Sequence, residues 1–160
     1  MSLLTPMLRT SPLTDWFSDV QRVQGMLDFE AALVRAEVEC GLVPQTALNP
    51  IIESCRHEKI DFSALGQAAS AGNLAIPLVK QLTARVKERN EAAARYVHWG
   101  ATSQDAIDTG FILQLRGALA ETESLLQRLL DALARQAERH QDTVMPGRTW
   151  MQHALPVTFG

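Results

Sequence analysis

The chain has 160 residues, of which 46% are hydrophobic and 21% are charged, and its formal net charge is -3. This composition is typical of one soluble globular domain, and the small acidic excess argues against nucleic acid as a partner. No run of about 18 or more apolar residues is present, so the sequence predicts no membrane span. Thr5 and Pro6 interrupt the apolar residues near the N-terminus, and two cysteines are too few for a disulfide framework. We therefore expect no signal peptide and a cytoplasmic protein.

Apolar residues recur at intervals of three and four along most of the chain, which is typical of amphipathic helices, and no stretch predicts a strand. We expect a first helix that is capped by Thr14 and ended by Gly41. Three further helices are predicted over residues 45–56, 61–71 and 74–88.

Polar residues and prolines set the ends of these shorter helices. Pro50 is expected to break the helix over residues 45–56 or to displace its start. Asp61 should cap the next helix, and Pro77 is tolerable because it falls in the first turn of the last one.

A long helix dominates the second half of the chain. After a loop over residues 90–101, Thr102 stands where an N-cap should be, and apolar periodicity without proline runs to about Gln141. Two adjacent apolar stripes follow this helix, one through Phe111, Leu115, Ala118, Thr122, Leu125, Leu129 and Ala132, the other through Ile112, Leu119, Leu126, Leu130, Leu133 and Ala137. The helix would be about 57 Å long, whereas a domain of this size is about 40 Å across. We infer that downstream helices, identical subunits or both cover the stripes.

The last part of the chain has no strong pattern. Residues 142–147 are expected to be irregular, and residues 148–160 end in Pro156 and Thr158, which look like the start of another helix. The expected fold class is therefore all-α.

The start of the long helix suits the binding of an anion. Its first turn presents unpaired backbone N–H groups, the Ser103 hydroxyl and the positive end of the helix dipole, which together attract carboxylates. His98 lies just upstream and can reach the same place. This stretch favours an all-helical enzyme that acts on a small polycarboxylate, and the alternative is an N-cap with no ligand.

Two sequence blocks resemble the fumarase/aspartase superfamily, and the long helix joins them. They are His98-Trp-Gly-Ala-Thr-Ser-Gln-Asp105 and Gly147-Arg-Thr-Trp-Met-Gln-His-Ala-Leu-Pro-Val-Thr-Phe-Gly160. The resemblance implies an N-terminal helical domain over residues 1–101 and, over residues 102–160, the start of the central helical bundle of a homotetramer. It also implies active sites built from three subunits. A third family block, with a catalytic serine and a lysine, has no match here, so we expect an N-terminal portion that is inactive alone.

The resemblance assigns roles to residues of both blocks. Thr102 and Ser103 match residues that bind a substrate carboxylate, and His98 matches a histidine that contacts substrate. Further expected substrate contacts are Thr149, Trp150, Gln152 and, by a weaker analogy at a helix break, Asn73. His153 is a second catalytic candidate. For His98, Trp150 and His153 a structural role is the alternative.

Trp150 stands where many lyases of the superfamily have a histidine that helps to protonate the departing amine or hydroxide. Such an acid is worth about 10²–10⁴-fold in rate. A carboxylate, with a pKa of about 4, leaves or attacks as the anion without help. The resemblance therefore implies the lactonizing branch, in which a carboxylate of 3-carboxy-cis,cis-muconate adds to a double bond. The alternatives are a β-elimination of the adenylosuccinate lyase type that releases fumarate, and a helical scaffold without activity.

No cofactor is expected for this reaction, because nothing is oxidised and the nucleophile is internal. The four histidines lack metal-ligand spacing, and no glycine-rich phosphate loop is present. The expected partners are a small polycarboxylate and identical subunits, with no nucleic acid and no membrane.

Overall fold

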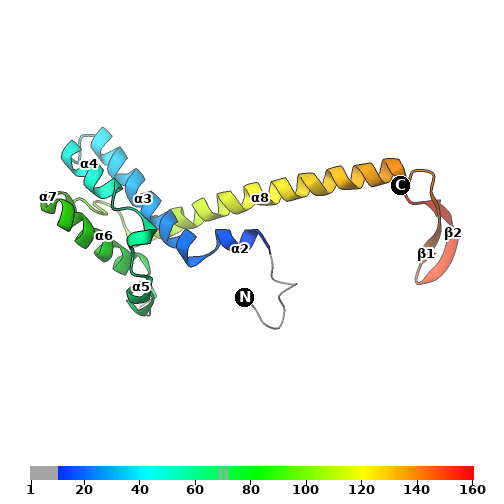
Figure 1. Ribbon diagram of the computed structural model, residues 1–160, viewed down its shortest axis with the longest axis horizontal. Coiled ribbons are helices and arrows are strands. Elements are labelled where there is room, and N and C mark those ends of the chain that lie inside the picture. Colours follow the sequence, from blue (N-terminus) through cyan, green and yellow to red (C-terminus); the bar gives the residue numbers. More distant parts are fainter. Residues whose placement is uncertain (1–10, 69, 71) are drawn as a thin grey trace. The chain divides into compact units, whose positions relative to one another are not determined.

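The structure, a computed structural model, describes residues 11–68, 70 and 72–160 (Figure 1). It divides into two compact units, a first that ends at Ala118 and a second that comprises Leu119–Gly160. The expected all-α class is confirmed, apart from one β-hairpin. The elements are α2 (Leu13–Trp16), α3 (Asp19–Glu39), α4 (Gln45–Ile52), the 3-10 helix η1 (His57–Lys59), α5 (Phe62–Ala68), α6 (Ala75–Arg89), α7 (Glu91–Ala94), α8 (Ser103–Arg139), β1 (Val144–Thr149) and β2 (Gln152–Thr158).

Helix α3 begins later than the sequence predicted. The prediction of one continuous helix from Thr14 is wrong, because α2 ends at Trp16 and a new helix starts after Ser18. The Ser18 backbone is extended, and its hydroxyl oxygen accepts a hydrogen bond from the backbone N–H of Gln21 at 3.4 Å. A serine in this conformation satisfies a donor that the helix itself leaves unpaired, so it sets the N-terminus of α3.

Three predicted helix boundaries are confirmed. Gly41 follows α3 with a φ of +71°, the left-handed conformation in which glycine ends helices. Asp61 Oδ1 accepts a hydrogen bond from the backbone N–H of Ala64 at 3.0 Å and so caps α5. Pro77 lies in the first turn of α6, where the missing N–H costs nothing.

Two details of the predicted helices are wrong. Pro50 neither breaks α4 nor displaces its start: the helix begins at Gln45, carries Pro50 inside and ends at Ile52. Burial of Ala47 and Ile51 on the inner face outweighs the one hydrogen bond that the proline removes. The predicted loop over residues 90–101 contains the short α7.

The core of the first unit lies where α3 packs on α4 and where α6 and α7 pack on α4 and on each other. Its largest fully buried apolar side chains are Met26, Leu27, Ile51, Leu78, Leu82, Val23, Val34 and Val86. Helix α8 joins this core through a contact between two glycines. A Cβ atom on Gly25 of α3 would lie 2.8 Å from the carbonyl oxygen of Gly110 of α8. Because neither glycine has a side chain, the backbones of the two helices can come into direct contact here.

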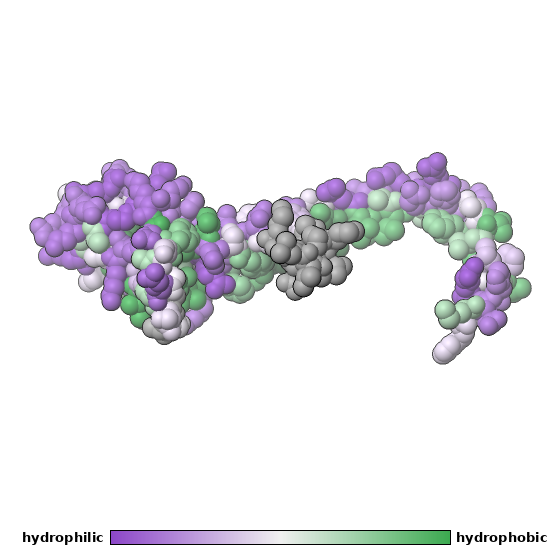
Figure 2. Space-filling view, turned by 60° about the horizontal axis from the view of Figure 1, so that its bottom comes forward, coloured by the Kyte–Doolittle hydropathy of each residue, from purple (hydrophilic) through white to green (hydrophobic). Residues whose placement is uncertain are grey.

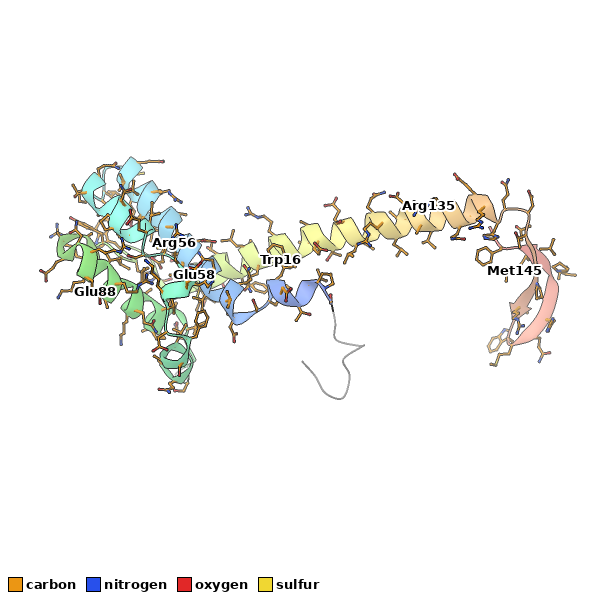
Figure 3. All side chains as sticks on the ribbon, in the orientation of Figure 1. Trp16, Arg56, Glu58, Glu88, Arg135 and Met145 are labelled. Carbon is orange, nitrogen blue, oxygen red and sulfur yellow. The ribbon has the colours of Figure 1, made fainter. Side chains whose placement is uncertain are left out.

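Helix α2 docks on α8 through Trp16, which Figure 3 labels. The Trp16 ring occupies the space that a Cβ atom on Gly117 would take. Gln114 Nε2 also donates a hydrogen bond of 2.7 Å to the backbone oxygen of Trp16. These contacts fasten α8 at Gln114 and Gly117, just before the unit boundary, to α2.

Residues 144–158 form an antiparallel hairpin, so the prediction of an irregular stretch followed by a new helix is wrong. Pro146 and Pro156 pair with each other, which a two-stranded ribbon allows because each strand has a free edge. The register shifts between Pro146 and Arg148, at Gly147. A Cβ atom on Gly147 would lie 2.5 Å from the opposite strand, so the bulge needs glycine.

In the second unit, α8 exposes its apolar stripes. Leu126, Leu129, Leu130 and Leu133 are each more than half exposed. Figure 2 shows the hydrophobic colour along one side of α8 and the hydrophilic colour along the opposite side. Exposure on this scale agrees with the inference that further polypeptide packs on the helix. None of the helices in the described part of the chain is long and apolar enough to span a membrane.

Candidate active site at the start of α8

Asn73 links the start of α6 to the start of α8. Its Nδ2 donates a hydrogen bond of 2.9 Å to Ser103 Oγ, and its Oδ1 accepts hydrogen bonds from the backbone N–H groups of Ala75 and Ile76 at 3.0 and 3.3 Å. One amide therefore caps α6 and occupies a lone pair of the Ser103 hydroxyl. No described residue accepts the hydroxyl hydrogen of Ser103, so this hydrogen is free to be donated to an anion.

Thr102 is engaged with Asp105 in the first turn of α8. The backbone N–H and the hydroxyl of Thr102 both donate to Asp105 Oδ2, at 2.8 and 3.0 Å. These two bonds hold the pKa of the Asp105 carboxyl below its ordinary value, and the bond from the backbone N–H has the larger effect. The Thr102 hydroxyl hydrogen is thus already used, and Ser103 is the better placed donor for a ligand.

His98 lies in the segment that leads into α8 and contacts a buried carboxylate. Its backbone has a φ of +57°, and its Nδ1 lies 2.6 Å from Oε1 of Glu30 of α3. The Glu30 side chain is only 3% exposed. Burial raises the pKa of Glu30, while the positive charge and the hydrogen bond of His98 oppose that rise. His98 also lies close enough to Asp105 for its charge to lower the pKa of that carboxyl slightly.

A cavity of about 260 Å³ in the first unit is lined by residues of α3, of α8 and of the segment before α6. Its lining includes Leu74, the neighbour of Asn73, and Ile107, one turn beyond Ser103. Arg22 of α3 lines the same cavity and brings a guanidinium group to it. Neither Asn73 nor Ser103 is among its lining residues, and sequence reasoning did not single out Arg22.

The candidate residues of the second block lie around the turn of the hairpin. Thr149 and Gln152 are the last paired residues of β1 and β2 before the turn, and His153 is paired with Arg148. Trp150 makes the turn with a φ of +48° and is 94% exposed, so it belongs to no core of the second unit. The candidates therefore form two groups, one at the start of α8 in the first unit and one at the hairpin turn in the second.

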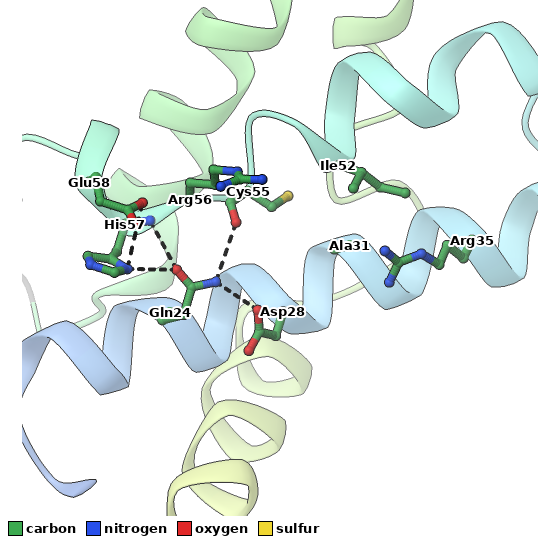
Figure 4. A pocket seen from close by; sticks show the side chains of 9 residues that line it. All are labelled: Gln24, Asp28, Ala31, Arg35, Ile52, Cys55, Arg56, His57 and Glu58. Carbon is green, nitrogen blue, oxygen red and sulfur yellow. Dashed lines mark hydrogen bonds and ion pairs between the residues drawn. The ribbon is translucent and has the colours of Figure 1, made fainter.

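A second cavity in the first unit, of about 470 Å³, lies beside His57 (Figure 4). Gln24 Oε1 accepts a hydrogen bond from the backbone N–H of His57 at 3.0 Å, and Gln24 Nε2 donates to Asp28 at 2.7 Å and to the Cys55 carbonyl at 3.4 Å. Both ends of the Gln24 amide are satisfied by protein groups, so this cluster fastens η1 to α3. Across residues 11–68, 70 and 72–160, no group of three or more His, Cys, Asp or Glu side chains could hold a metal ion.

Glu30 is the functional candidate that sequence reasoning missed. It occupies a position three residues after Leu27 and four before Val34, on the buried face of α3. An acidic residue among apolar ones at helical spacing indicates a buried carboxylate that needs a partner. The pattern alone does not reveal the partner, because His98 lies 68 residues further along the chain.

Comparison with known proteins gives consistent matches. A family model described as Lyase matches residues 7–160. The chain is 60% identical to a 3-carboxy-cis,cis-muconate cycloisomerase from Pseudomonas aeruginosa, over 94% of the chain and 33% of that protein. It is 42% identical to a nitrosuccinate lyase from Streptomyces davaonensis, over 99% of the chain and 34% of that protein. Its fold matches the crystal structure of the 3-carboxy-cis,cis-muconate lactonizing enzyme from Pseudomonas putida with a TM-score of 0.93 and 52% identity, over 98% of the chain and 36% of that structure.

The chain spans about a third of the length of the curated relatives that it matches. The similarity therefore covers the start of α8 and the hairpin but not the remainder of those proteins.

Proposed function

We propose that this chain, which belongs to the lyase family of the fumarase/aspartase superfamily, is part of a cycloisomerase that lactonizes 3-carboxy-cis,cis-muconate. The observation that carries the proposal is Trp150 at the hairpin turn, in a chain with 60% identity to a cycloisomerase. A lyase that expels an amine or hydroxide needs an acid, and an indole side chain cannot supply one. Lactonization does not need that acid, because the attacking group is a carboxylate.

The proposed reaction is an intramolecular addition. One carboxylate oxygen of the substrate forms a bond to a carbon of a double bond and closes a five-membered lactone. The electron pair of that double bond moves to the other alkene carbon, which lies beside another carboxyl group. That carboxyl group takes up the charge and becomes an aci-carboxylate. A proton then adds to this carbon from a donor outside the present chain, and no atom is lost. Hydrogen-bond donors aimed at the aci-carboxylate stabilise the charge that develops.

Residues of both groups take part in this proposal. Ser103 donates its free hydroxyl hydrogen to a substrate carboxylate, with Asn73 holding the hydroxyl oxygen. The backbone N–H groups at the start of α8 add to the attraction. From the hairpin, Thr149 and Gln152 contribute polar contacts, and Trp150 offers a flat wall for a conjugated diene. His98 and His153 are candidate catalytic residues that donate hydrogen bonds to the substrate, whereas the proton of the addition comes from the donor outside this chain.

We propose further that the active protein is a cytoplasmic homotetramer. The exposed leucines of α8 support association, because a stripe of this kind is unfavourable in water. In such an assembly the hairpin of one subunit supplies residues to the α8 start of another, as the resemblance to the superfamily implies.

A second candidate reaction is β-elimination from a substituted succinate that releases fumarate. The identity of 42% to a nitrosuccinate lyase favours it, since that alignment covers 99% of this chain. In this reading His98 or His153 replaces the missing acid at position 150.

The test is a substrate comparison with the full-length enzyme that contains this chain. We expect the diene absorbance of 3-carboxy-cis,cis-muconate to disappear as the lactone forms, with no turnover of adenylosuccinate. Persistence of the diene while adenylosuccinate or another substituted succinate releases fumarate would support the second candidate instead.

A further inference from the structure

We propose that Glu30 is a positioning residue, which holds the His98 ring by Nδ1 so that Nε2 is the nitrogen presented to the substrate. The inference rests on the proposed function, because it concerns the same site. Its basis is the contact of 2.6 Å between His98 Nδ1 and Glu30 Oε1. Within the described part of the chain, no group bonds to Nε2.

The backbone around Glu30 and the backbone of His98 both support this geometry. The contact between Gly25 and Gly110 fixes α8 against α3, and Glu30 lies little more than one turn beyond Gly25 on the same helix. His98 has a φ of +57°, a conformation that is costly for a residue with a Cβ atom and persists where surrounding contacts hold it. The bond to Glu30 is such a contact.

The charge of the pair determines what Nε2 can do. A carboxylate beside Nδ1 requires a hydrogen on Nδ1, since two acceptors would repel each other. The bond to Glu30 therefore fixes the orientation of the ring and leaves Nε2 as the ring nitrogen that can meet a substrate.

A merely structural carboxylate is the competing explanation, and the variants separate the two. Glu30→Gln keeps the size of the side chain and an oxygen acceptor but removes the charge, so either tautomer of His98 becomes available. Glu37→Gln is the matched control: Glu37 is also a buried acid on α3, two turns away, and it has no bond to His98. His98→Asn keeps a donor toward Glu30, removes Nε2 and tolerates a positive φ.

The experiment measures kcat and KM of the full-length enzyme for the single variants and for the Glu30→Gln/His98→Asn double variant. We expect Glu30→Gln to lower kcat/KM by about 10- to 100-fold, which corresponds to the loss of one hydrogen bond to a charged group. We expect Glu37→Gln to leave kcat/KM within about twofold of the unaltered enzyme. In the His98→Asn background, Glu30→Gln should cost no further activity, because its effect acts through the ring.

Equal losses from Glu30→Gln in both backgrounds would overturn the proposal, and so would equal losses from Glu30→Gln and Glu37→Gln. If the unaltered enzyme turns over a different polycarboxylate, the proposed reaction is wrong. The same cycle measured with that substrate still decides whether Glu30 acts through His98.

Discussion

Asn73 Nδ2 donates a hydrogen bond of 2.9 Å to Ser103 Oγ, and this single bond connects the residue that caps α6 to the first turn of α8. The bond occupies one lone pair of the Ser103 hydroxyl and leaves its hydrogen available for a ligand. Two substitutions of Asn73 separate this effect from helix capping.

Asn73→Asp should keep the cap of α6, because the carboxylate still accepts from the N–H groups of Ala75 and Ile76. It removes the donor to Ser103, whose hydroxyl hydrogen then turns to the carboxylate. We expect a higher KM with little change in thermal stability. Asn73→Ala loses both roles and should also cost about 1 kcal/mol of stability. An unchanged KM for Asn73→Asp would show that Ser103 does not depend on this bond.

Asp105→Asn tests the first turn of α8 through its pH dependence. The pKa of Asp105 is depressed in the folded state by its bonds to Thr102. A depressed folded pKa means that the ionised group stabilises the fold above its ordinary pKa near 3.8, and that this stabilisation is lost as the pH falls through the depressed value. The difference in urea midpoint between the unaltered protein and Asp105→Asn should therefore be larger near neutral pH than at about pH 3. A constant difference would contradict the assignment.

Trp150→His distinguishes the two candidate reactions. The side chain is 94% exposed within its unit, so the substitution should leave the hairpin folded. A cycloisomerase should lose kcat/KM toward 3-carboxy-cis,cis-muconate, because the flat wall is removed and the new acid has no leaving group to protonate. Trp150→Phe, which retains a ring, should lose less. A gain of fumarate-releasing activity in Trp150→His would favour the lyase.

Gly25→Ala tests the contact between α3 and α8. The new methyl group would lie 2.8 Å from the Gly110 carbonyl oxygen, so the helices must separate. We expect a loss of about 1–3 kcal/mol in the free energy of unfolding. Gly66→Ala in α5 is the control, since a Cβ atom there meets nothing within 4 Å, and it should gain about 0.5–1 kcal/mol. Similar effects of the two substitutions would argue against the close approach.

The two cysteines should differ in reactivity. Cys40 is exposed, whereas Cys55 is buried. Burial is the main cause, and the charge of Glu30 the next, that raises the pKa of the Cys55 thiol to about 12. Since the thiolate is the reactive form, iodoacetamide should label Cys40 and spare Cys55 until the protein unfolds. Mass spectrometry of the labelled peptides measures both sites, and rapid native labelling of Cys55 would contradict this burial.

The sequence predicted the helices where local chemistry is decisive. Asp61 caps α5 and Gly41 ends α3, because a side-chain acceptor and a left-handed glycine act within a few residues. The hairpin was missed because its turn is Trp150-Met151, with φ values of +48° and +63°, instead of the usual Asn-Gly. Its strands carry Pro146 and Pro156, which normally argue against strands.

The candidate site divides in the same way. Ser103 at a helix start could be found from the sequence, because the unpaired N–H groups of a first turn are a local property. Its bond to Asn73 and the pairing of His98 with Glu30 depend on how α3, α6 and α8 pack together. Contacts over 30 and 68 residues of chain leave no local signal.

We propose that a carboxylate binds at the start of α8 through the free hydrogen of Ser103. The most direct measurement is the dissociation constant of propane-1,2,3-tricarboxylate for the full-length enzyme and its Ser103→Ala variant. A hydrogen bond to a charged group contributes about 1.5–3 kcal/mol, so Ser103→Ala should weaken binding by about 10-fold or more. Equal dissociation constants for the two proteins would contradict the claim.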